Sequence, residues 1–229
     1  MVTDRDRSVV RWVAVIGAVS AQDVMARFRL GRTVGYRRLA TLFDVGLLAR
    51  KRLVYGQPAL YVATADGVAF AGLGELDPAR INEASVRHWV LCARLAVVLE
   101  RRERREVWGG PRLRAAERQE GRPVASAQRG TLPDGRPRLR RPDLVLFPPD
   151  TALPMAVEVE LSVKAAGRLQ SICRAWARCR LVSEVRYYAP PEVARAVSRA
   201  VSSVHAQDAI RVLSLQEALK EAPNDRLAA

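Results

Sequence analysis

Residues 141–147 read RPDLVLF, and residues 155–161 read MAVEVEL. Both stretches are rich in the aliphatic and β-branched residues that favour strands. Residues 148–150, which lie between them, have the proline and aspartate content of a turn. The sequence therefore predicts two consecutive strands, and both carry acidic residues.

The acidic residues of these two strands are expected to converge. Side chains two residues apart lie on one face of a strand, so Glu158 and Glu160 project together, about 6.6 Å apart along the strand. The alternate residues project toward the core: Met155, Val157, Val159 and Leu161. Asp143 begins the preceding strand and is close enough to join the glutamates. Because three hard oxygen donors suit Mg²⁺ or Mn²⁺, the sequence predicts a metal site at Asp143, Glu158 and Glu160.

Helices and further strands surround this pair. The predicted elements are a helix over 83–106, short strands and a mobile loop (121–138) within 107–142, a helix over 164–181, a strand over 184–189, a helix over 191–203 and a strand over 210–215. Helix, three strands, helix, strand is the layout of the PD-(D/E)xK nuclease core. Residues 83–220 therefore resemble a restriction-endonuclease-like domain of α/β (α+β) class.

The motif of that nuclease core is matched in part. Asp143, preceded by the expected proline, corresponds to the first acid, and Glu158 corresponds to the second. The position two residues after Glu158 is Lys in the motif and Glu160 here, as in some restriction endonucleases. Lys164 lies four residues further on and is able to turn its ammonium group back toward the acids. The acid that the first helix often contributes is expected to be Glu100 or Glu117.

An active site of this kind performs metal-assisted phosphodiester hydrolysis. Asp143 and Glu158 would hold Mg²⁺, which lowers the pKa of a bound water. Glu160 would orient that water or bind a second ion, and Lys164 would stabilise the developing charge on phosphorus. The alternative is that Glu158 and Glu160 form ion pairs with basic neighbours, for which the candidates are Arg140, Arg141 and Arg168.

The first part of the chain, residues 1–75, has a different pattern. The predicted elements are a helix over 7–17, a short helix over 21–28 with Ser20 as N-cap, a helix from Thr33 to about Val45, strands over 48–55 and 59–63, and a helix over 64–73. This order is that of a winged helix-turn-helix, and residues 72–82 form the expected hinge to the second domain.

The third helix of this domain is the predicted DNA-reading element. Its buried stripe is expected to consist of Val34, Leu39, Leu42 and Phe43. Arg32, Tyr36 and Arg37 lie on or near the opposite side, where a helix in the major groove contacts bases. On the hairpin, Arg50, Lys51 and Arg52 are expected to meet phosphates.

The composition favours a polyanionic partner. The chain has 38 Lys and Arg against 24 Asp and Glu, a net charge of +14, although a GC-rich genome would also raise the arginine content. Three cysteines and two histidines show no CxxC or zinc-type spacing, which favours a reducing cytoplasm. The apolar runs at 12–21 and 90–99 are too short to span a membrane. Double-stranded DNA is the expected partner.

Over most of residues 7–220, the chain resembles the replication-relaxation family of plasmids and integrative elements. The resemblance lies in the winged helix, a helix opening near His88-Trp89, the Pro-Asp before a strand, and the VEVELSxK stretch that begins at Val157. It implies DNA binding linked to replication or mobilisation of an element, with or without nicking. In the non-catalytic alternative, an accessory factor or repressor uses a degenerate nuclease-like domain to clamp DNA or to form a homodimer.

Overall fold

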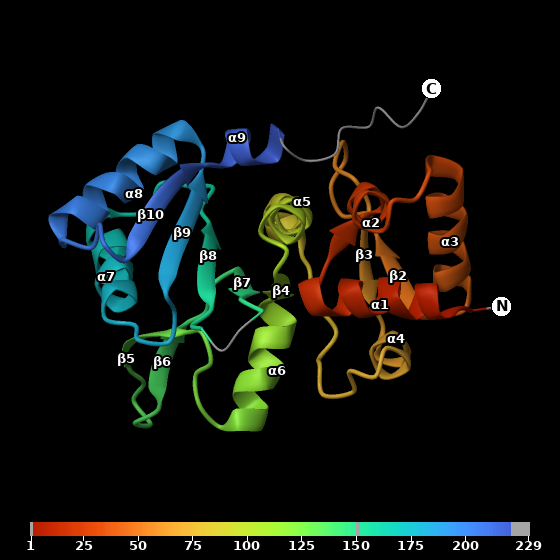
Figure 1. Cartoon of the computed structure of the whole chain (residues 1–229), viewed down its shortest axis with the longest axis horizontal. Helices are drawn as coiled ribbons and strands as arrows, with labels where there is room; N and C mark the ends of the chain where they lie inside the picture. Colours follow the sequence, from red (N-terminus) through yellow and green to blue (C-terminus); the bar gives the residue numbers. More distant parts are fainter. Residues whose placement is uncertain (1, 150–151, 221–229) are drawn as a thin grey trace.

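The computed structural model describes residues 2–149 and 152–220 of the chain. The described residues form a mixed α/β structure with a three-stranded, a five-stranded and a two-stranded sheet. Figure 1 shows the N-terminal elements on one side of the long helix α5 and the five-stranded sheet on the other. No helix in the described ranges is long and apolar enough to cross a membrane.

The N-terminal part contains four helices and a small sheet. Its elements are α1 (Asp4–Ile16), β1 (Val19–Ser20), α2 (Ala21–Phe28), α3 (Arg32–Asp44), β2 (Leu48–Lys51), β3 (Leu60–Ala63) and α4 (Ala65–Phe70). The strands pair antiparallel in the order β1-β3-β2. The predicted N-cap is confirmed, because Ser20 accepts a hydrogen bond from the Asp23 backbone and Asp23 caps in return. The hairpin strands are shorter than predicted, and the short strand β1 is an addition.

Helix α3 differs from its prediction in its cap and in its buried face. It begins at Arg32, and Gly31 rather than Thr33 is the N-cap. Val34 and Phe43 are 39% and 49% exposed, so their predicted burial is wrong. The buried residues of α3 are Gly35, Leu39 and Leu42. The cause is the close contact with α2, since a Cβ at Gly35 would lie 2.3 Å from the Met25 side chain.

The second part contains the larger sheet. Its elements are a 3₁₀ turn (Glu83–Ser85), α5 (Val86–Glu103), β4 (Glu106–Gly109), α6 (Gly110–Glu120), β5 (Ala127–Thr131), β6 (Pro137–Arg140), β7 (Leu144–Phe147), β8 (Met155–Val159), α7 (Ala166–Ala177), β9 (Glu184–Ala189), α8 (Pro191–Ser203), β10 (Ile210–Ser214) and α9 (Leu215–Lys220). The sheet order is β10-β9-β8-β7-β4. Strands β8, β9 and β10 run parallel, whereas β4, β7 and β8 pair antiparallel. Helix α6 is an addition to the predicted elements.

The sheet is covered on both faces, which places the acidic residues inside the protein. Helix α5 packs against one face, and α7 and α8 pack against the other (Figure 1). Met155, Val157 and Val159 lie in the core, as predicted, and that core includes residues of α5; Leu161 is only partly buried against it. Glu158 lies on the side of α7, and only 1% of its side chain is exposed. Strands with two covered faces need a partner for every polar group that they carry.

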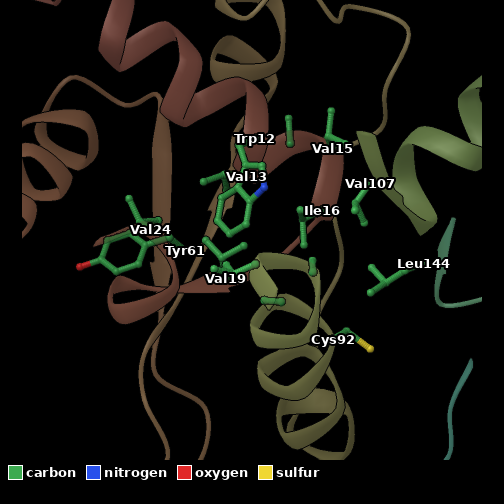
Figure 2. Packing of buried hydrophobic residues seen from close by; sticks show 14 of the residues in the cluster. Trp12, Val13, Val15, Ile16, Val19, Val24, Tyr61, Cys92, Val107 and Leu144 are labelled. Carbon is green, nitrogen blue, oxygen red and sulfur yellow. The ribbon is translucent and has the colours of Figure 1, made fainter. Parts of the chain in front are cut away.

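The two parts of the chain share one apolar core. Figure 2 shows Ile16 of α1 near Val107 of β4, Leu144 and Cys92 of α5, and Trp12 of α1 belongs to the same apolar cluster. The backbones are in close contact, since a Cβ at Gly109 would lie 2.3 Å from the Ile16 carbonyl oxygen. The predicted domains, 1–75 and 83–220, therefore pack against one another through buried apolar side chains.

Candidate functional site

Asp143 is the centre of the candidate site. It lies directly before β7, and its backbone N–H donates to the Val157 carbonyl of β8. Its Oδ2 accepts a hydrogen bond of 2.7 Å from the Val159 backbone N–H. Its Oδ1 lies 3.1 Å from Nε2 of His88, on the first turn of α5. This hydrogen bond is the main cause that raises the pKa of His88, and burial opposes it.

Glu158 forms a buried ion pair. Arg140, at the end of β6, donates Nε to Oε1 at 2.8 Å and Nη2 to Oε2. Trp176 of α7 donates its indole N–H to Oε1 at 3.0 Å. Burial raises the pKa of Glu158 to about 7, against the opposing effect of the Arg140 charge. The alternative in which Arg140 pairs with this glutamate is therefore the arrangement that the structure has.

Glu160 and Lys164 pair with one another four residues apart, just after β8. Their side chains are 8% and 21% exposed. Burial lowers the pKa of Lys164, and the nearby Arg140 lowers it further. The expectation that Lys164 turns back toward the acids agrees with this contact.

The structure thus places the predicted acids at the same end of strands β7 and β8, but each acid has a basic partner. Those partners are His88 for Asp143, Arg140 for Glu158 and Lys164 for Glu160. A Mg²⁺ ion takes six oxygen ligands and needs carboxylate oxygens that are free to bind it. In this arrangement the donor set does not fit Mg²⁺, and no hydrolytic step follows from it. Metal binding by Asp143, Glu158 and Glu160 stays a prediction.

The acid expected from the first helix lies elsewhere. Glu100 accepts from Trp12 Nε1 at 3.0 Å and pairs with Arg27, so it joins the two parts of the chain. Glu117 pairs with Arg141 and accepts from the Ser126 hydroxyl. Glu100 and Glu117 are therefore paired with residues outside the predicted metal site.

Two residues of the site, His88 and Cys92, are not among the site residues predicted from the sequence. His88 is expected to be structural or exposed, and in the structure it contacts Asp143. Cys92 lies one helical turn after His88, with its Sγ 3.3 Å from the His88 Nε2. The sequence shows no zinc-type motif here, although a separation of four residues places two side chains on one helix face. The four-residue spacing of His88 and Cys92 is the feature of the sequence that could have indicated their place in the site.

The predicted DNA-contacting residues lie on adjacent elements, because α3 packs against β2. All six side chains are exposed or partly exposed: Arg32, Tyr36, Arg37, Arg50, Lys51 and Arg52. Among the residues that the structure describes, none of the five basic ones has an acidic partner within ion-pair distance. Figure 1 shows α3 at the end of the molecule opposite to α8.

Comparisons of the chain with protein-family models, with curated proteins and with solved structures find no match. The resemblance to the replication-relaxation family therefore stays a prediction.

Proposed function

We propose that this chain is a DNA-binding protein whose N-terminal part is a winged helix-turn-helix. The order α1, β1, α2, α3, β2, β3, α4 and the sheet order β1-β3-β2 support that fold. Helix α3 would enter the major groove, and the β2–β3 hairpin would act as the wing. The observation that carries the proposal is the set of exposed basic side chains on α3 and the β2–β3 hairpin without acidic partners in the described ranges, which suits phosphate contacts.

The second part supports the same partner with a further basic cluster. Arg129 and Arg138 lie on the β5–β6 hairpin, and Arg168 lies on α7, which packs against β5. Burial lowers the pKa of Arg129, and so do the charges of Arg138 and Arg168. Within the described ranges, Arg129 Nε is buried without a hydrogen-bond acceptor. A DNA phosphate bound by the exposed Arg138 and Arg168 would relieve the repulsion among the three guanidinium groups.

The nuclease-like part is best assigned a non-catalytic, DNA-clamping role. Its strand order and the positions of Asp143 and Glu158 support the PD-(D/E)xK layout. The bidentate contact of Arg140 places a guanidinium group at the oxygens that a catalytic metal would use. We therefore propose an accessory factor in replication or mobilisation of a genetic element, in line with the family resemblance.

Metal-dependent nicking is the second candidate. It is favoured by the presence of Asp143, Glu158, Glu160 and Lys164 around the end of one strand, and it requires Arg140 to leave Glu158. A plasmid nicking assay with Mn²⁺ separates the candidates. The clamping role predicts no nicking above that of an Asp143→Asn variant. Nicking that needs both Mn²⁺ and Asp143 would establish the second candidate instead.

The test of DNA binding uses the full chain and a fluorescent duplex. The variant Arg32→Ala/Arg37→Ala should weaken binding at least about tenfold, since a base-edge contact contributes roughly 1–3 kcal/mol. The matched control is Arg195→Ala/Arg199→Ala, which removes two arginines from α8 at the other end of the molecule (Figure 1). Equal losses in the two variants would contradict the assignment of α3, because they would show attraction to net charge alone.

A further inference from the structure

Three side chains of different chemistry meet at Asp143, one of the predicted acids. His88 Nε2 lies 3.1 Å from Asp143 Oδ1 and 3.3 Å from Cys92 Sγ. All three ligand atoms lie within 4.8 Å of one another. Two come from one face of α5 and the third from the start of β7, so packing of the helix on the sheet fixes their arrangement. Figure 2 shows Cys92 on the side of α5 that is turned toward Leu144, the neighbour of Asp143.

A single hydrogen bond at Nε2 cannot serve both the Asp143 carboxylate and the Cys92 thiol. The Nε2 atom of a neutral imidazole either donates one proton or accepts one. If it donates to the Asp143 carboxylate, it cannot also accept the thiol proton of Cys92. In the other tautomer, Nε2 accepts from the thiol and leaves two acceptors, nitrogen and carboxylate oxygen, facing one another. A metal ion in place of these protons would satisfy nitrogen, sulfur and oxygen together.

We propose that His88, Cys92 and Asp143 form a binding site for a borderline-soft divalent metal of the zinc class. Tetrahedral Zn²⁺ with these ligands has bonds of about 2.0–2.3 Å, which place neighbouring ligand atoms roughly 3.3–3.7 Å apart. The separations of 3.1 and 3.3 Å in the cluster are already near that range. A thiolate and an imidazole select against Mg²⁺, which prefers oxygen ligands.

The surroundings of the cluster suit a metal site. The Val159 backbone N–H fixes the second oxygen of Asp143, as outer hydrogen bonds do for many metal ligands. The side chains of His88 and Asp143 are 35% and 21% exposed, whereas Cys92 is buried. A metal ion therefore reaches the site from the His88 side, and solvent provides the fourth ligand. Binding converts the thiol to a thiolate and releases its proton to water.

Co²⁺ is the probe for this site, because a thiolate bound to it gives a charge-transfer absorption band. The full-length chain should bind one Co²⁺ with this band, and Zn²⁺ should displace it. Cys92→Ser should abolish the band. Cys179→Ser is the matched control, since Cys179 is a half-buried thiol whose Sγ donates to the Ser126 carbonyl, and it should keep the band.

His88→Gln and Asp143→Asn keep the thiol and test the other two ligands. Each should weaken Co²⁺ binding by at least about 10–100-fold, the loss seen even for outer-shell partners. A large excess of Mg²⁺ should leave the band unchanged. The proposal is overturned by absence of the band in the unmodified chain, by its persistence in Cys92→Ser, by unchanged affinity in both other variants, or by displacement with Mg²⁺. It stands or falls independently of DNA binding.

Discussion

At the scale of single residues, the buried pair of Glu158 and Arg140 has the clearest energetic consequence. The Glu158 side chain is almost fully shielded from water, whereas the Arg140 side chain is 28% exposed. Removal of Arg140 leaves a buried carboxylate without its cation, whereas removal of the Glu158 charge leaves a guanidinium that still reaches solvent. The two losses are therefore unequal.

Arg140→Ala should destabilise the metal-free protein by about 3 kcal/mol, the low end of the range for a broken buried pair. Glu158→Gln should cost less, because Gln keeps an acceptor for the Trp176 indole. Urea unfolding in EDTA measures both. If Glu158→Gln stabilised the protein instead, carboxylate repulsion would dominate, and the acids would be candidates for Mg²⁺ after all. In that case Mn²⁺ should raise the melting temperature of the unmodified chain.

Glu100 gives a pH-dependent prediction. Burial raises its pKa, against the opposing effect of Arg27. A carboxyl group with a raised pKa in the folded state contributes stability that is present below the ordinary pKa and is lost as the pH rises through the raised one. As the pH rises above the ordinary carboxyl pKa of about 4, Glu100→Gln should therefore lose less stability than the unmodified chain. A series of urea unfolding curves measures this difference, and parallel pH profiles would show that the burial of Glu100 has no such effect.

At the scale of elements, the sequence predicts most helices and strands but not how they meet. The strands that contain Leu144–Phe147 and Met155–Val159 follow from their composition, and the Ser20–Asp23 cap follows from spacing. The sequence offers Arg140, Arg141 and Arg168 as partners of Glu158 but does not choose among them, because the choice depends on where the folded chain places the β5–β6 hairpin. Helix α6 is not predicted, because its segment is rich in Gly, Pro and Arg. Pro111 in the first turn of α6 is nevertheless a residue that favours the start of a helix.

The packing of α1 against β4 gives a prediction at the same scale. Gly109→Ala would place a methyl group against the Ile16 carbonyl and should destabilise the protein by about 1–3 kcal/mol. Gly74→Ala is the control, since an added Cβ there meets nothing within 4 Å. Thermal unfolding of both variants measures the difference. Equal melting temperatures would contradict the close contact between the two parts of the chain.

At the scale of the whole molecule, the shared core means that the two parts should not unfold independently. Side-chain contacts connect α1 and α2 to α5 through Trp12, Arg27 and Glu100. The largest apolar cluster also extends through both parts of the chain. Two independent domains would give two transitions, whereas a shared core favours one cooperative transition. Far-ultraviolet circular dichroism and tryptophan fluorescence should therefore give the same urea midpoint. Separate midpoints would contradict the cooperative unit.

The charge distribution is also a property of the whole molecule. Its effect on salt dependence tests the central claim, which is DNA binding. The net charge of +14 alone attracts DNA weakly, whereas defined phosphate contacts release counterions in proportion to their number. With about five phosphate contacts, the slope of log K against log salt concentration should be near −4 or steeper. Arg50→Ala/Lys51→Ala/Arg52→Ala should flatten the slope by the contacts that these residues make.

The most direct measurement is therefore a salt titration of duplex binding by the full chain, followed by fluorescence anisotropy. We predict a slope of about −4 or steeper in the unmodified protein, reduced by roughly 1–3 in the triple variant of the β2–β3 hairpin. A slope near −1, or a slope that the triple variant leaves unchanged, would contradict it.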